Sequence, residues 1–235
     1  MKLWKAWLAD LLNLFFPPAC LVCGHRLVDQ KLVICEACEA RVALVSPAVC
    51  PVCGSESQSN PCEVCAEEHF AFSSVRAVFK YRGPVKDLIH ELKYNGYNSP
   101  AGYFAVPLGE LIESDPQLQD HDFLCPVPLH RVRKRERGYN QSELIAYAAS
   151  VISGMPYAEP LKRRFYTRSQ TLLSRAKRHK NLLNAFKVIN ANDVKGKRII
   201  VVDDVFTTGS TLNEIAKTLL AAGAGKVTAL TVARA

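Results

Sequence analysis

From about residue 73 onward, segments with the apolar pattern of a strand alternate with segments that have the apolar pattern of a helix. Residues 73–81 alternate and are rich in valine and phenylalanine, which predicts a strand. Residues 123–127 and 199–202 are continuous apolar runs typical of buried strands, and 226–233 is expected to form a last strand. The chain from this point therefore contains four expected strands, separated by segments of a different period.

Apolar residues at spacings of three and four predict helices in those separating segments. The first helix begins at the pair Gly83-Pro84, which suits a helix start. The helices expected after it run over about 102–112, 140–152, 176–185 and 210–222. The basic stretch 131–137 is expected to be a loop. Strands that alternate with helices predict an α/β domain with a mostly parallel sheet, whose ligands bind beyond the carboxyl ends of the strands.

Cysteine spacing, rather than hydrophobic period, organises the first 70 residues. Eight of the nine cysteines form four Cys-x-x-Cys pairs: Cys20 and Cys23, Cys35 and Cys38, Cys50 and Cys53, Cys62 and Cys65. A two-residue gap lets both thiolates of a pair face one ion, and two pairs complete a tetrahedral zinc site. We expect about two structural zinc ions, because so short a segment cannot bury a sufficient apolar core alone.

Two pairings of the cysteine pairs are compatible with the spacing. Sequential pairing joins the first pair to the second and the third to the fourth, whereas a cross-braced arrangement joins alternate pairs. A short helix expected over 36–45, followed by Ser46-Pro47, favours two consecutive units and hence sequential pairing. We place a helix and a double zinc-binding module in residues 1–70, and the α/β domain in 71–235. The ninth cysteine, Cys125, lies in an apolar run and is expected to be a buried small hydrophobe.

Composition sets broad limits on function. The 235 residues are 49 % hydrophobic and 22 % charged, as in a soluble globular protein, and no apolar run is long enough to span a bilayer. Asp10 and Asn13 interrupt the apolar start, so an amphipathic helix is favoured there over a signal peptide or a membrane-surface anchor. We therefore expect a cytoplasmic location. The net charge of +8, concentrated in 131–137 and 162–180, suggests an anionic partner.

The segment 198–211 carries the most specific chemistry in the chain. An apolar strand runs into Asp203 and Asp204, then into a small polar loop that opens a helix. Backbone N–H groups and the positive helix end at such a loop bind phosphate, and hydroxyls add donors. The expected phosphate-binding residues are Thr207, Thr208, Gly209, Ser210 and Thr211. Two carboxylates cannot bind phosphate, so Asp203 and Asp204 are assigned to a ribose diol.

This segment resembles the signature of type I phosphoribosyltransferases, in which an acidic pair holds the ribose hydroxyls of phosphoribosyl pyrophosphate and the next loop holds its 5-phosphate. The whole chain resembles the ComF competence family. Besides the segment 198–211, that resemblance rests on the cysteine pairs and on the motifs Pro126-Val127-Pro128-Leu129, Arg137-Gly138-Tyr139-Asn140-Gln141, Gln170-Thr171, Arg178 with Asn181, and Ala185-Phe186. It implies a phosphoribosyltransferase-type fold behind a double zinc ribbon.

The resemblance implies binding of phosphoribosyl pyrophosphate with Mg2+, and a role in DNA uptake during natural transformation, with single-stranded DNA or proteins of the uptake machinery as partners. Arg137 is the candidate catalytic residue, because a guanidinium can grip pyrophosphate oxygens. Whether transfer occurs, and to which acceptor, stays open. Thr207 stands where several purine-using relatives have an acidic residue, which puts purine salvage in doubt. The alternative is a non-catalytic nucleic-acid-binding adaptor with a sensory or vestigial ribose-phosphate site.

Overall fold

The computed structural model of this chain describes residues 17–29, 31–46, 49–57, 59–165 and 184–235. Its centre is a four-stranded sheet in the order β1-β6-β5-β2, in which every strand pair is parallel. The strands are β1 (Val75–Lys80), β2 (Phe123–Pro126), β5 (Arg198–Phe206) and β6 (Lys226–Arg234). The expected α/β fold with a mostly parallel sheet is confirmed.

Helices connect these strands, as the apolar spacing predicts. They are α4 (Pro84–His90), the π-helical turn η1 (Glu91–Asn95), α5 (Ser99–Ser114), α6 (Pro116–Gln119), α7 (Arg131–Arg137), α8 (Gln141–Ser153), the 3-10 turn η2 (Ala191–Asp193) and α10 (Ser210–Ala221). The helix expected near 176–185 lies outside the described residues except for its last two, which are not helical. The helix expected in the first 16 residues also lies outside them.

The basic stretch 131–137 is a helix and not the expected loop. The His130 side chain caps its start by accepting a hydrogen bond from the N–H of Val132 at 3.3 Å. Gly138 ends it with a φ of +85°, and its N–H donates to the carbonyl of Lys134. Arginine and lysine are good helix formers. Helix propensity and two end signals therefore account for a helix where a loop was expected.

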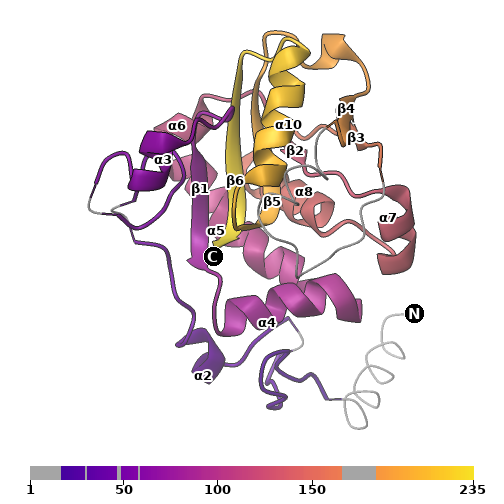
Figure 1. The fold of residues 1–235 in the computed structure, drawn as a ribbon. Coiled ribbons are helices and arrows are strands. Elements are labelled where there is room, and N and C mark those ends of the chain that lie inside the picture. The colour runs from indigo at the N-terminus through magenta and orange to yellow at the C-terminus, as the bar shows by residue number, and fades with distance from the viewer. Residues whose placement is uncertain (1–16, 30, 47–48, 58, 166–183) are drawn as a thin grey trace.

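Helices cover both faces of the sheet (Figure 1). Ile200 and Val202 of β5 face the layer that contains α4, α5 and α8. Ile199 and Val201, which alternate with them, face the layer formed by α10. All four side chains are at most 1 % exposed, because a parallel strand covered on both faces buries every position. Both layers leave the carboxyl ends of the strands at one edge of the fold.

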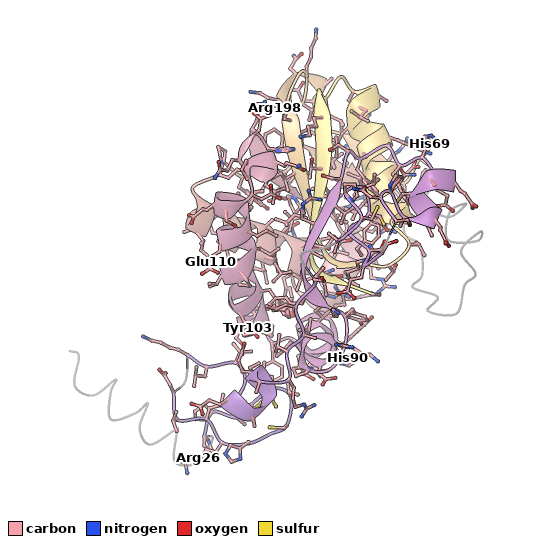
Figure 2. The ribbon with its side chains drawn as sticks, turned by 90° about the vertical axis from the view of Figure 1, so that its left-hand side faces the viewer. Arg26, His69, His90, Tyr103, Glu110 and Arg198 are labelled. Atoms are coloured by element: carbon pink, nitrogen blue, oxygen red, sulfur yellow. The ribbon has the colours of Figure 1, made fainter. Side chains whose placement is uncertain are left out.

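The two cysteine groups take different positions on this domain. The helix α2 (Glu36–Glu39) belongs to the first group, and α3 (Glu63–Glu67) belongs to the second. Figure 2 shows Arg26, within the first group, at the opposite end of the molecule from Arg198, where β5 begins. The second group lies beside the sheet in Figure 1. The helix expected over 36–45 is only four residues long.

The outer edge of β1 is covered by the segment that joins the two cysteine groups. The N–H of Val45 donates to the carbonyl of Val78 at 2.9 Å, and the N–H of Lys80 donates to the carbonyl of Ala43 at 2.8 Å. Residues 43–45 are thus an extended partner for β1, which explains why α2 ends early. A sequence period cannot indicate this pairing, because the partner strand is distant in the chain.

A second, two-stranded sheet was not expected from the sequence. It pairs β3 (Leu161–Arg163) with β4 (Phe186–Val188) in antiparallel register. Strands of three residues carry too few alternating positions to give a period. Among the helices that the structure describes, none combines the length and the apolar character needed to cross a bilayer.

Candidate functional site

Each group of four cysteines is arranged to hold one metal ion. The sulfur atoms of Cys20, Cys23, Cys35 and Cys38 lie within 4.8 Å of one another, as do those of Cys50, Cys53, Cys62 and Cys65. One sulfur pair in each group is 3.6 Å apart. A tetrahedral zinc ion with bonds of about 2.3 Å separates its sulfur ligands by about 3.8 Å. Both groups therefore fit zinc, and the pairing is sequential rather than cross-braced.

Local hydrogen bonds favour the thiolate form of at least one cysteine in each group. Burial raises the pKa of the Cys20 thiol, but hydrogen bonds from backbone groups of Cys23, Cys35 and Val22 outweigh it and lower this pKa to about 6. Burial likewise opposes ionisation of Cys62, whose pKa is nevertheless lowered to about 6, chiefly by the Ser55 hydroxyl and the backbone at Cys65. A thiolate is the form that binds zinc, so each group contains a cysteine that ionises readily, whereas burial raises the pKa of Cys38 and of Cys65 in the same groups.

The two metal centres join different apolar clusters of the fold. Cys23 of the first group is exposed. In the second group Cys50, Cys53 and Cys62 are buried and belong to the same apolar cluster as Val201 of β5. Cys20 and Cys38 of the first group are buried as well, in the apolar cluster that contains Ile200 of β5. The two centres are therefore built into the apolar clusters on opposite faces of the sheet.

The acidic pair lies within β5 rather than after it. The apolar run that predicts this strand ends at residue 202, but β5 continues to Phe206, and Asp203 is aligned with Thr231 of β6. Asp204 is only 4 % exposed. Two adjacent carboxylates in a sheet are costly unless each is hydrogen-bonded or paired, so their partners identify the site.

Both carboxylates have such partners. Asp204 accepts hydrogen bonds from Lys93 Nζ at 2.7 Å and from Gln141 Nε2 at 2.8 Å. Asp203 Oδ1 accepts from Ser142 Oγ at 3.1 Å and from the N–H of Asp204 at 3.0 Å. The pair is therefore held by α8 on one side and by the π-helical turn η1 on the other.

Charge is shared unequally between these groups. Burial and the neighbouring Asp204 carboxylate raise the pKa of Asp203 from 3.8 to about 7, although Lys93 works against the rise. Burial disfavours the Lys93 ammonium, but the Asp204 charge outweighs it and the pKa of Lys93 is raised. Lys93 and Asp204 thus form an ion pair, and Asp203 is the group that titrates near neutral pH.

Arg137 is brought to the same place. Its guanidinium donates to Oε1 of Gln141, whose amide donates to Asp204, and it lies 5.6 Å from the centroid of the Tyr94 ring. Burial lowers the pKa of Arg137, and the negative charge of Asp204 offsets part of this lowering. Lys134 of the same helix pairs instead with Glu143 at 2.6 Å. Arg133 lies close enough to Arg137 for its positive charge to contribute to the lowered pKa.

The 207–211 loop runs from the end of β5 to the start of α10. Gly209 has a φ of +74°, and a Cβ placed there would come within 2.8 Å of the Phe206 ring. Only glycine combines this left-handed backbone with so close an approach. The hydroxyls of Thr208 and Ser210 are 2.9 Å apart. The five residues expected to bind phosphate thus follow the strand that carries the acidic pair and lie at the amino end of α10.

The chain matches two known protein domains. The sequence profile of the double zinc ribbon domain matches residues 11–70, and that of the phosphoribosyl transferase domain matches 127–235. The DNA utilization protein YhgH of Escherichia coli is 33 % identical over 217 residues, covering 90 % of this chain and 94 % of that protein. Competence protein F of Haemophilus influenzae is 31 % identical over 229 residues, covering 94 % and 99 %. The chain belongs to the ComF competence family.

The fold of this ComF-family protein is of the phosphoribosyltransferase type, as the domain profile shows. Solved structures of that type are more distant. The glutamine phosphoribosylpyrophosphate amidotransferase of Bacillus subtilis is 23 % identical, with a TM-score of 0.40 over 57 % of this chain and 26 % of that one. A hypoxanthine phosphoribosyltransferase of Staphylococcus aureus is 11 % identical, with a TM-score of 0.37 over 61 % and 69 %.

Two residues of the candidate site were not identified from the sequence. Lys93 follows the helix start at Gly83-Pro84, and the sequence period gives no sign that the chain changes there to a π-helical turn. Ser142 follows the cap residue Asn140, and only the packing of α8 against β5 places its hydroxyl at Asp203. Of the family motifs, Gln170, Thr171, Arg178 and Asn181 lie outside the described residues. Phe186 is a buried residue of β4, in keeping with a structural role.

Proposed function

We propose that this ComF-family protein binds phosphoribosyl pyrophosphate together with Mg2+ and works in the handling of DNA during uptake. The observation that carries the proposal is the meeting of three parts: a buried acidic pair, a hydroxyl-rich loop at a helix start, and two cations, Lys93 and Arg137. The acidic pair suits ribose hydroxyls, the loop suits a phosphate monoester, and the cations suit a pyrophosphate. The names of the competence and DNA utilization relatives support the DNA-uptake role.

The oxygen atoms at Asp203 fit Mg2+ as ligands, because this ion prefers hard oxygen ligands and is commonly shared with substrate phosphates. Carboxylate and hydroxyl oxygens of Asp203 and Ser142 supply that chemistry. Bound Mg2+ would add positive charge on the pyrophosphate. Within the protein, Gln141 joins Arg137 to Asp204, and Lys93 holds the other Asp204 oxygen. If transfer to an acceptor takes place, these two cations are positioned to stabilise the leaving pyrophosphate.

Asp203→Asn together with Asp204→Asn tests this proposal. Hydrogen bonds to a charged group contribute about 1.5–3 kcal/mol each, so the double variant should bind phosphoribosyl pyrophosphate roughly a hundredfold more weakly at about 1.4 kcal/mol per decade. Calorimetric titration with Mg2+ present measures the change. Inorganic phosphate should still bind at the 207–211 loop, because backbone amides and the helix end provide that contact.

Asp120→Asn is the matched control, because Asp120 is an acidic residue that pairs with Arg198 at the far end of β5. It should leave the affinity unchanged. Equal affinity of the double variant and the wild type would refute ribose binding by the acidic pair. Pyrophosphate release in the presence of candidate bases then separates a transferase from a protein that only binds the ligand.

The adaptor alternative draws on α7. Arg131 and Arg135 are exposed on this helix, and a cationic helix face can contact nucleic-acid phosphates without reading bases. Affinity for single-stranded DNA that falls steeply with salt, combined with no pyrophosphate release, would favour this function. Charge reversal at Arg131 and Arg135 should then reduce the salt slope while leaving phosphoribosyl pyrophosphate binding intact.

A further inference from the structure

The short segment between the second cysteine group and β1 lies against the 207–211 loop. A Cβ built on Gly209 would come within 3.2 Å of Cε1 of Phe70, so this ring packs on the loop backbone. The N–H of Ala71 donates to Oδ1 of Asn213 at 2.6 Å, and the N–H of Asn213 donates to the carbonyl of Gly209 at 2.8 Å. The segment therefore touches the loop directly and also holds the first turn of α10.

Aromatic rings continue this contact into the strand that leads to the loop. Phe70 stacks on Phe72 with ring centroids 4.7 Å apart. Phe72 and Phe206 make a T-shaped contact with ring centroids 6.2 Å apart. Phe72 and Phe206 are 2 % and 3 % exposed. Since Phe70 follows α3, which carries Cys65, by three residues, the second metal centre and the loop are joined by a short packed path.

A second path starts from the other Cys-x-x-Cys pair of the same centre, Cys50 and Cys53. The guanidinium of Arg234 donates to the carbonyl of Cys53 and lies 3.7 Å from its Sγ. The same guanidinium lies 4.8 Å from the centroid of the Phe206 ring. Phe206, which precedes the loop, is therefore connected to both Cys-x-x-Cys pairs of the second group. Phe72 and Phe70 lead to the pair of Cys62 and Cys65, and Arg234 leads to the pair of Cys50 and Cys53.

The first metal centre has no such connection among the described residues. Its neighbours in the α/β domain are Tyr103, whose hydroxyl donates to Glu39 at 2.9 Å, and the apolar cluster on the α5 face of the sheet. The loop and α10 lie on the opposite face. The two centres, similar in sequence, therefore differ in their relation to the 207–211 loop.

We propose that the second zinc centre is a positioning element for the 207–211 loop, acting through Phe70 and Arg234, and that the first centre is not. The value of such positioning for ligand binding rests on the proposed function, but the order of the loop does not. Backbone donors bind an anion well when their directions are fixed beforehand. Phe70 packs on the loop at Gly209, whose backbone flexibility would otherwise leave those directions free.

Native-state hydrogen exchange of the amides of residues 207–211 tests the proposal without any ligand. Phe70→Ala removes the ring and should raise the exchange rates of the loop about tenfold, whereas Phe70→Leu keeps part of the contact and should raise them less. Tyr103→Ala is the matched control, since it removes an aromatic ring at the first centre. Cys62→Ser and Cys35→Ser, which weaken the second and the first centre, should show the same contrast.

Unchanged loop exchange in Phe70→Ala, or an equal rise in Tyr103→Ala, would overturn the proposal. If Cys62→Ser does not fold, the phenylalanine variants still decide the question. Titration of the same variants with phosphoribosyl pyrophosphate and Mg2+ should show about tenfold weaker binding for Phe70→Ala. Absence of binding by the wild type would contradict the proposed function alone, because the exchange rates report on the loop in either case.

Discussion

Asp203→Asn should make the folded protein more stable at alkaline pH, although it removes a residue from the proposed ligand site. In the folded protein the pKa of Asp203 is raised to about 7, first by burial and then by the adjacent Asp204 carboxylate. Ionising Asp203 therefore opposes folding. Asparagine carries no charge, and its Oδ1 can still accept the hydrogen bonds of Ser142 and of the Asp204 N–H.

The sign and size follow from proton linkage. A raised pKa means that the folded state binds the proton more tightly, so stability is fully present below 3.8 and is lost as the pH rises through about 7. The complete loss is about 4 kcal/mol at 1.36 kcal/mol for each pKa unit. Between about pH 5 and about pH 8 the wild type should lose roughly 2–3 kcal/mol from this residue, and Asp203→Asn should not.

Urea unfolding followed by circular dichroism, with zinc present, measures the difference at both values of pH. Asp204→Asn is the comparison, because it leaves Lys93 without its ion-pair partner and should destabilise the protein by about 2 kcal/mol or more. Neighbouring acids should thus respond in opposite directions. A variant Asp203→Asn that is no more stable than the wild type at about pH 8 would refute the account of the site electrostatics.

Three further predictions concern single features of the fold. Lys93→Met removes the ammonium from Asp204 and should weaken phosphoribosyl pyrophosphate binding at least tenfold in calorimetry; an unchanged affinity would count against a role for Lys93. Asn140→Ala leaves the carbonyl of Val127 and the N–H of Ser142 without their partner, and should lower the free energy of unfolding by about 1–3 kcal/mol in urea titrations. Elemental analysis should find about two zinc ions per chain, and a value near one would show that one cysteine group does not bind metal.

The sequence was sufficient for the parts of the fold that local pattern controls. The apolar run at 199–202 predicted the central strand, and the cysteine spacing predicted two four-thiolate centres. Even there the limits of the strand were wrong, because Asp203 and Asp204 are polar and look like the start of a loop. Their membership of β5 depends on the ladder with β6, which lies more than twenty residues further along the chain.

The parts that the sequence did not predict depend on contacts between distant segments. Lys93 reaches Asp204 across 111 positions of sequence, and no local period records that approach. The helix α7 was missed for a different reason, since the basic stretch 131–137 was interpreted as a loop, although arginine and lysine favour helices and Gly138 suits a helix end. Candidate site residues can thus be proposed from motifs, while their partners come from the packing.

The backbone bonds that residues 43–45 make with β1 also bear on solubility. An uncovered edge strand is a template on which a strand of another molecule can pair, and apolar positions such as Val75 and Phe79 would strengthen that association. The segment that blocks this edge is held at both ends by a cysteine group. Chains that have not yet acquired zinc would therefore expose β1, and self-association of newly made protein should decrease as metal becomes available.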